Sequence, residues 1–268
     1  MPVPQPLQAL RLAWPLAKRD VLARYRGSAA GLAWGLVAPL GMVLVYTLVF
    51  RGVFQARWAT GGGTGDDAAD GFGFVTRLFA GLLLFQAAAE VSTRATRLMQ
   101  DNANLVKRVV FPLELLGTAL LLQVGVHLLL QAALLSVLLA LFGPGPRLSW
   151  LLLPLALAWL WLLLQVLALA LSALGAYVRD LQHAVPVVMT GALFLSPVFY
   201  PSAAAPGALA WLLALNPLTV PIELARAAWF GDAFDLSTAT AHGAVLLLAL
   251  PAARWLFRRL RPGFPDLV

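Results

Sequence analysis

The sequence has no cysteine and few charged residues. Of its 268 residues, 12% are Asp, Glu, Lys or Arg and 61% are hydrophobic, and the mean hydropathy is +0.84. The absence of Cys excludes a disulfide framework and a thiolate-ligated metal. The shortage of charge excludes an ordinary soluble domain, because a chain of this size could not hide so much apolar surface from water. The composition therefore predicts a protein embedded in a membrane.

The sequence has only two lysines, and it contains none of the common motifs of ATP hydrolysis or of hydrolytic catalysis. Neither Lys18 nor Lys107, the only lysines, follows the glycine-rich loop G-x-x-x-x-G-K-[ST] that cradles phosphates. The sequence also has no H-E-x-x-H, no G-x-S-x-G and no metal-spaced cluster of His, Asp and Glu. We therefore expect a chain that is not an enzyme and holds neither a metal nor a cofactor. The net charge of +7 comes from basic residues at the ends of hydrophobic runs, so we expect no nucleic-acid partner.

The hydrophobic runs predict an all-α polytopic membrane protein with six spans in one domain, residues 1–268. The first run, Gly27 to Phe50, has 24 uncharged residues, which at about 1.5 Å per residue cross a hydrocarbon core of about 30 Å. In the second span, Arg77 and Glu90 lie near the ends, where we expect both side chains to reach toward water. A glycine-rich loop with Asp66, Asp67 and Asp70, expected to be solvated, separates these two spans. The remaining spans are predicted at about 72–91, 115–146, 148–178, 184–200 and 236–257.

Three segments outside the spans have distinct patterns. Residues 7–27 alternate basic and apolar side chains, which predicts an amphipathic helix lying at the membrane interface. Residues 92–112 are polar and basic and predict a cytoplasmic loop. Residues 207–231 are apolar but interrupted at Asn216-Pro217, which predicts two short re-entrant helices before the last span.

The distribution of basic residues favours six spans over seven. If 207–231 returns to the side from which it enters, fourteen of the nineteen Lys and Arg residues lie on one face, which is cytoplasmic by the positive-inside rule. If the segment crossed fully, the ratio would shrink to ten against nine. We therefore expect both termini in the cytoplasm.

The sequence contains five distinctive segments, in this order: RDVLARYRGSAAGLAW, NANLVKRVVFP, YVRDLQHAVPV, FLSPVFYP and NPLTVPIELARAAWFG. Together they resemble the membrane permease subunit of ATP-binding-cassette polysaccharide exporters, which move O-antigen, capsule and teichoic-acid polymers. The resemblance runs from about Lys18 to Gly231. The Phe-Pro-Arg-Glu pattern usual in that family reads Phe111-Pro112-Leu113-Glu114 here, and a Trp common in its second span is Phe85.

The resemblance implies a homodimeric permease in the bacterial inner membrane. Its partners would be two nucleotide-binding subunits, which bind ATP and Mg²⁺, and its substrate a lipid-linked polysaccharide, with O-antigen favoured. Aromatic residues of the first and fifth spans would line the substrate path, although interfacial belts and plain packing also explain such residues. Arg24 and Arg26 would meet the lipid diphosphate or simply anchor the helix to anionic lipid.

The residues expected to act fall into three further groups. The substrate path would comprise Trp34, Tyr46, Phe50, Phe54, Phe194, Phe199 and Tyr200; the ATPase-coupling residues Asp20, Tyr25, Asn102, Asn104, Lys107 and Arg108; and the outer gate Asn216, Pro217, Glu223 and Arg226.

Two alternatives stay open at this point. One is a drug or lipid exporter permease of the same superfamily. The other is a membrane-embedded polymer-assembly transferase, for which the candidate acid–base residues are Glu90, Glu114, His183 and Glu223. Turnover by the purified chain without an ATPase would establish the transferase. For His127, within the third span, we expect a structural hydrogen bond rather than proton transfer.

Overall fold

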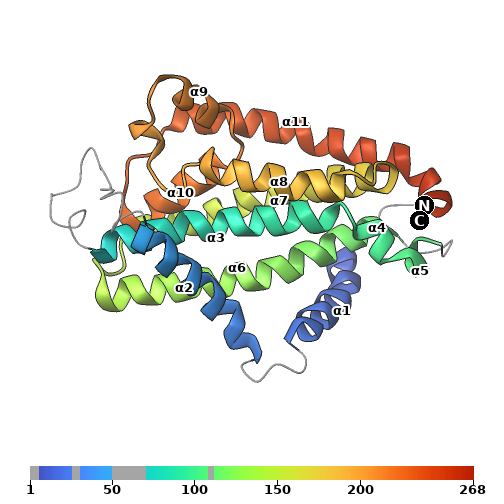
Figure 1. Ribbon diagram of the computed structural model, residues 1–268, viewed down its shortest axis with the longest axis horizontal. Coiled ribbons are helices and arrows are strands. Elements are labelled where there is room, and N and C mark those ends of the chain that lie inside the picture. Colours follow the sequence, from blue (N-terminus) through green and yellow to red (C-terminus); the bar gives the residue numbers. More distant parts are fainter. Residues whose placement is uncertain (1–5, 26–30, 50–70, 108–111) are drawn as a thin grey trace.

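The long helices of the chain run side by side along its longest axis (Figure 1). A computed structural model describes residues 6–25, 31–49, 71–107 and 112–268. At the centre, α3 (Gly71–Ala95), α6 (Glu114–Phe142) and α7 (Leu153–Tyr177) pack against one another, and α11 (Leu236–Leu260) packs on α7. Within the described residues, four stretches are long and apolar enough to cross a membrane: 72–95, 114–142, 148–177 and 236–267. These four confirm the second, third, fourth and sixth runs as membrane-length helices.

Two shorter apolar helices correspond to the first and fifth predicted spans. They are α2 (Trp34–Thr47), preceded by the 3₁₀ turn η1 (Gly31–Ala33), and α8 (Leu181–Phe194). Fourteen residues are only about 21 Å of helix. The bounds predicted for the fifth span were wrong, because α8 ends at Phe194 and residues 195–200 form turns. Pro197 explains the early end, since it lacks an N–H and restricts the residue before it to extended conformations.

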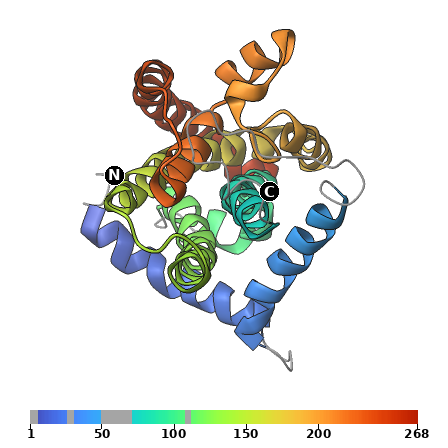
Figure 2. The ribbon, with the colours of Figure 1, turned by 90° about the vertical axis from the view of Figure 1, so that its left-hand side faces the viewer.

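The N-terminal helix α1 (Pro6–Tyr25) lies against the outside of the bundle. It contacts α6 through small side chains, with Ala13 and Ala17 buried against Ala119. Leu12, Trp14 and Leu22 are exposed on α1. Viewed along the bundle, α1 and α2 both lie outside the central helices (Figure 2). Helix α1 is therefore peripheral to the bundle, and its position at the membrane interface stays a prediction.

Short helices gather at the end of the bundle that holds the C-terminus (Figure 1). They are α4 (Leu98–Asp101), α5 (Ala103–Val106), the 3₁₀ turn η5 (Arg261–Gly263) and α12 (Phe264–Leu267). Phe264 is fully buried, with its ring 5.5 Å from that of Phe257 and 6.1 Å from that of Tyr177. Because α12 also contacts α5, the C-terminal residues support this short helix.

Two short helices precede the last long one, as predicted. They are α9 (Gly207–Leu215) and α10 (Thr219–Phe230), and their break falls at Asn216-Pro217. Asn216 fixes the break, since its Nδ2 donates to the Leu195 carbonyl at 2.9 Å and its Oδ1 accepts from Leu218 N–H at 2.9 Å. Helix α10 ends at Gly231, whose φ of +75° is easily adopted only by glycine. At about 14 and 18 Å, neither helix is long enough to span a bilayer.

The last long helix begins with a side-chain cap. The Asp235 carboxylate accepts hydrogen bonds from the backbone N–H groups of Ser237 and Thr238 and from their hydroxyls. These bonds, chiefly those from the hydroxyls, lower the pKa of Asp235 to about 2. The cap therefore stays charged at neutral pH and defines where α11 starts.

Two 3₁₀ helices lie in the connections between the longer helices. The connection between α6 and α7 is the tight turn that was predicted, followed by η3 (Leu148–Leu152). The second, η4 (Ser202–Ala204), lies before α9.

Candidate transport path and coupling surface

Aromatic residues from the first and fifth predicted spans meet beside α3. The ring of Tyr46 on α2 lies 5.3 Å from that of Phe199, at an interplanar angle of 74°. Phe199 in turn stacks on Phe194, with centroids 5.4 Å apart and planes at 25°. The Tyr200 hydroxyl donates to the Phe194 carbonyl at 2.6 Å. Four residues proposed for the substrate path are thus brought together from segments about 150 residues apart.

This aromatic cluster offers one open ring and one buried ring. Phe194 is 54% exposed, whereas Phe199 is 5% exposed and supports it from behind. An exposed apolar ring held in a fixed orientation can stack on the apolar face of a sugar. Trp34 is also exposed, but it lies twelve residues before Tyr46, about 18 Å along α2, and belongs to a different part of the surface. Phe50 and Phe54 lie outside the described residues.

A charged pocket lies at the opposite end of the bundle, beside α4. Its volume is about 220 Å³, and α1, α3, α4 and α6 contribute to its walls. Asp20 and Arg19 from α1 pair with each other at 3.0 Å and face it together with Arg94 from α3. Arg94 donates to Glu90 at 3.1 Å and to Gln123 at 2.8 Å. Two of the residues expected to couple to an ATPase, Asp20 and Asn102, therefore line one pocket.

The remaining coupling residues lie on or near the same end. Asn104 and Lys107 are exposed, and Asn102 uses its side-chain amide to hold the Leu98 carbonyl at 2.9 Å. Tyr25, like Arg24, belongs to α1, but its side chain is not described. Arg26 and Arg108 lie outside the described residues.

A close contact with α7 holds this coupling segment in place. A side chain at Gly175 would bring its Cβ within 2.2 Å of the Thr96 carbonyl oxygen. The Gln100 side chain donates to the Gly175 carbonyl at 2.8 Å. The segment between α3 and α5 is thus fixed to the end of α7 by a contact that only glycine permits. This contact could not be predicted from the sequence, because nothing in the local pattern marks Gly175.

The outer helices are held by a buried arginine. Arg226 on α10 is 2% exposed and donates to the Val198 carbonyl at 2.7 Å, to the Pro197 carbonyl, and to the Arg77 carbonyl at 3.4 Å. Glu223 accepts from the Ser202 backbone N–H at 3.1 Å. The predicted gate residues therefore tie α10 to the connection after α8 and to α3. Their role in gating stays a prediction.

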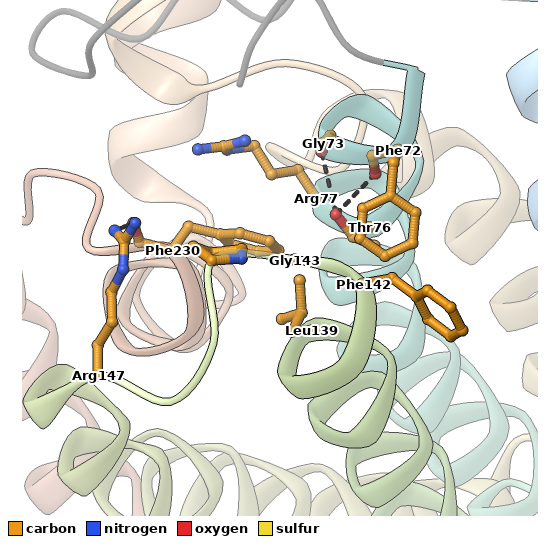
Figure 3. Close-up of a pocket in the computed structure, with 10 residues that line it drawn as sticks. Phe72, Gly73, Thr76, Arg77, Leu139, Phe142, Gly143, Arg147 and Phe230 are labelled. Atoms are coloured by element: carbon orange, nitrogen blue, oxygen red, sulfur yellow. Dashed lines mark hydrogen bonds between the residues drawn. The ribbon is translucent and has the colours of Figure 1, made fainter. Parts of the chain in front are cut away.

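Arg77 does not reach toward water, as was expected from its place near the end of a span. Its side chain is 9% exposed and pairs with Asp232 at 3.2 Å, and its guanidinium lies 4.7 Å above the ring of Phe230 (Figure 3). Asp232 lies 155 residues from Arg77 in the sequence, so the local pattern does not show this pair. Only a general rule indicated that Arg77 has a partner, namely that a charge within a membrane segment is usually paired. Arg147 beside it donates to the Phe230 carbonyl at 2.9 Å and was not singled out from the sequence either.

The transferase candidates lie in separate places. Glu90 pairs with Arg94, Glu114 pairs with Arg258 at 3.3 Å, and His183 lies beside the Gln182 amide at 3.2 Å. With Glu223 on α10, these four residues are distributed over α3, α6, α8 and α10. The contacts are those of fold-stabilising residues rather than of a general acid and base brought together. His127 is buried and its Nδ1 lies 2.9 Å from the Gln123 carbonyl, a hydrogen bond of the kind expected.

The structure is a helical bundle with four described helices of membrane length, and the comparison with known families shows which class of membrane protein it is. The ABC-2 type transporter family matches residues 11–230, and the chain belongs to this family. It is therefore a multi-pass membrane protein and a transporter component rather than a catalytic enzyme.

The names of individual relatives are more specific than the description of the family. An O-antigen export system permease protein RfbA of Myxococcus xanthus is 27% identical over 254 residues, covering 94% of this chain and 93% of the relative. A protein of the same name from Klebsiella pneumoniae is 24% identical over 204 residues, covering 76% of this chain and 74% of the relative. In both comparisons the similarity extends over about three quarters or more of each chain.

Proposed function

We propose that this chain is the permease half of an ATP-driven exporter that moves a lipid-linked cell-surface polysaccharide, O-antigen, from the cytoplasm across the inner membrane. The observation that carries the proposal is the aromatic cluster of Tyr46, Phe194 and Phe199, in a chain whose relatives are named O-antigen export permeases. A polymer channel needs weak and repeated contacts with sugar rings, and exposed aromatic rings provide them without demanding one sugar sequence.

The assembly would be a homodimer with two nucleotide-binding subunits. The end that carries Asp20, Asn102, Asn104 and Lys107 would face the cytoplasm, and the ATPase would dock there. The Lys and Arg side chains within 7–27 support this orientation, and so does the excess of Lys and Arg that six spans place on one face of the membrane. In this arrangement α2 and α8 would belong to the first and fifth of six spans. Arg24 and Arg26 would contact the diphosphate of the incoming lipid-linked substrate.

The outer end would be closed by α9 and α10. Their lengths, and the hinge that Asn216 stabilises, support a re-entrant pair that lies in the membrane without crossing it. Irregular backbone at membrane depth is tolerated where protein shelters it, and Arg226 supplies that shelter for the carbonyls of Pro197 and Val198. We place the gate motion in α9, because Trp211 and Leu215 on α9 are exposed whereas α10 is buried.

A strain lacking this reading frame tests the proposal. It should accumulate lipid-linked polysaccharide inside the cell and lose O-antigen from the surface, and expression of the intact chain should restore both. Phe194→Ala together with Tyr46→Ala should restore surface polysaccharide several-fold less well than the intact chain. The matched control is Trp255→Ala, which removes an exposed aromatic ring from α11. Normal surface polysaccharide in the deletion strain, with altered resistance to a drug instead, would assign the chain to a different export class.

A further inference from the structure

A second pocket lies at the end of the bundle away from α4 and α5. Its volume is about 260 Å³, and it is formed by the start of α3, the end of α6, the turn between α6 and α7, and the end of α10. Figure 3 shows Arg77 and Arg147 on one side of it and the Phe230 ring between them. The pocket is separate from the aromatic cluster proposed for the substrate path and includes none of its residues.

The charges around this pocket do not cancel. Arg77 donates from Nε and Nη2 to the two Asp232 carboxylate oxygens, at 3.4 and 3.2 Å. Arg147 donates from Nη1 to the Phe230 carbonyl. A guanidinium has five N–H donors, so the contacts seen among residues 71–107 and 112–268 leave several donors beside the pocket. Among the described residues that line the pocket or pair with its lining, two cations (Arg77 and Arg147) and one carboxylate (Asp232) give a net charge of about +1, which favours an anion with several acceptor oxygens.

The rim of the pocket is apolar and faces outward. Phe142, which lines the pocket, is 71% exposed, and Leu148, the residue after the lining residue Arg147, is 84% exposed. Leu141 and Leu151, close to these two in the sequence, are exposed as well. In a multi-pass membrane protein, such a rim is suited to acyl chains. A cationic recess beside an apolar rim matches a ligand with an anionic head and a hydrocarbon tail, rather than a soluble anion.

The size of the pocket limits the ligand further. Pockets for drug-sized molecules are commonly about 300–1,000 Å³. A recess of about 260 Å³ is therefore suited to a lipid head group and too small to enclose a stretch of polysaccharide.

We propose that this pocket binds the phosphate head group of an anionic phospholipid, with Arg147 and Arg77 contacting the phosphate and the rim of Phe142 and Leu148 contacting the acyl chains. The site does not depend on which substrate the transporter moves. The topology proposed above places the bound lipid in the outer leaflet of the membrane. Since Arg77 and Phe230 also hold the end of α10, lipid bound there would steady α10 against α3.

The binding of phosphatidylglycerol to the purified permease, with its nucleotide-binding partner where one co-purifies, tests this site. Dioleoyl phosphatidylglycerol and dioleoyl phosphatidylcholine are titrated, and bound lipid is counted by native mass spectrometry. The intact chain should prefer phosphatidylglycerol. Arg147→Gln should weaken phosphatidylglycerol binding about tenfold, because one charge-assisted contact is lost. Arg147→Lys should weaken it less, since the charge is kept but the planar fork is not.

The matched control is Arg179→Gln, which removes an exposed arginine from the connection between α7 and α8. It should leave the phosphatidylglycerol preference unchanged. Because Arg77→Gln alone would leave Asp232 unpaired, its role is tested in the double variant with Asp232→Asn, which should also weaken binding.

Four results would overturn the proposal. One is equal binding of the two lipids by the intact chain, and another is phosphatidylglycerol binding by Arg147→Gln within twofold of the intact chain. The third is displacement of phosphatidylglycerol by millimolar inorganic phosphate, which would indicate a soluble-anion site. If Arg147→Gln instead dissociates a dimer without changing lipid binding, the pocket belongs to a subunit contact and the lipid assignment is wrong.

Discussion

At the scale of single residues, two buried arginines are stabilised in different ways. Arg77 has a carboxylate partner in Asp232, whereas Arg226 donates mainly to the backbone carbonyls of Pro197 and Val198. A cation removed from water is strongly destabilising unless it is paired and hydrogen-bonded. The carbonyls that Arg226 holds follow the end of α8, where Pro197 and the turns leave them without helical partners. Arg226 therefore gives its Nη1 and Nη2 donors hydrogen-bond partners and at the same time satisfies carbonyls of an irregular backbone segment.

Replacing Arg226 should loosen the outer end. Arg226→Gln removes donors from the Pro197 and Val198 carbonyls and should lower the free energy of unfolding by about 1.5–3 kcal/mol, the range for hydrogen bonds to a charged group. If α9 and α10 form a gate, the same variant should raise the ion conductance of the ATP-free permease in a planar bilayer. Arg179→Gln, at an exposed position, should change neither quantity. Unchanged thermal unfolding and conductance in Arg226→Gln would show that these contacts are not needed for closure.

At the scale of elements, the two short outer helices are unequal. Every residue of α10 except Glu223 is buried, whereas α9 is largely exposed. Helix α10 is thus part of the core, packed on α3, α7 and η3. Helix α9 is attached mainly through its C-terminal end, where the Thr219 hydroxyl donates to the Leu213 carbonyl at 2.6 Å and a His242 ring nitrogen lies 2.6 Å from the Ala214 carbonyl. Any movement at the outer face would therefore be easier for α9.

A corresponding argument applies at the coupling end, where α12 packs against α5 and α7. Phe264→Ala would empty a fully buried site between Phe257 and Tyr177. Such a change typically destabilises by about 3–5 kcal/mol. Because α12 supports α5, we expect ATP hydrolysis by the partner subunit to respond several-fold less to substrate. The readout is substrate-stimulated ATPase activity of the complex, and Asp266→Asn, an exposed change in the same helix, serves as the control. If Phe264→Ala leaves the substrate stimulation of ATPase activity unchanged, α12 has no role in coupling.

The sequence predicted these elements well where local chemistry determines them. Pro217 and Gly231 mark the break and the end of the two outer helices, because proline lacks a donor and only glycine easily adopts a φ of +75°. The aromatic cluster was anticipated only through resemblance to a family, since periodicity does not show that α2 and α8 meet. The pairing of Arg77 with Asp232 and the close approach of Gly175 to Thr96 could not be predicted, because both depend on packing between segments distant in the sequence.

At the scale of the whole molecule, the arrangement of charge predicts orientation. Fourteen of the nineteen basic residues fall on one face if the chain crosses six times. A reporter fused after Val268 should therefore report the cytoplasm, and one inserted near Gly62 should report the exterior. A C-terminal reporter outside the cell would contradict six spans and would require 207–231 to cross the membrane completely.

The most direct test of the polysaccharide-export proposal is transport by purified components. Proteoliposomes that contain this chain and its nucleotide-binding partner are given lipid-linked O-antigen on the ATPase side, and polymer reaching the opposite side is measured with and without ATP. The account predicts ATP-dependent delivery of the polymer, reduced several-fold by Phe194→Ala with Tyr46→Ala and unaffected by Trp255→Ala. ATP-dependent movement of a drug or a simple lipid with no delivery of polymer would contradict it.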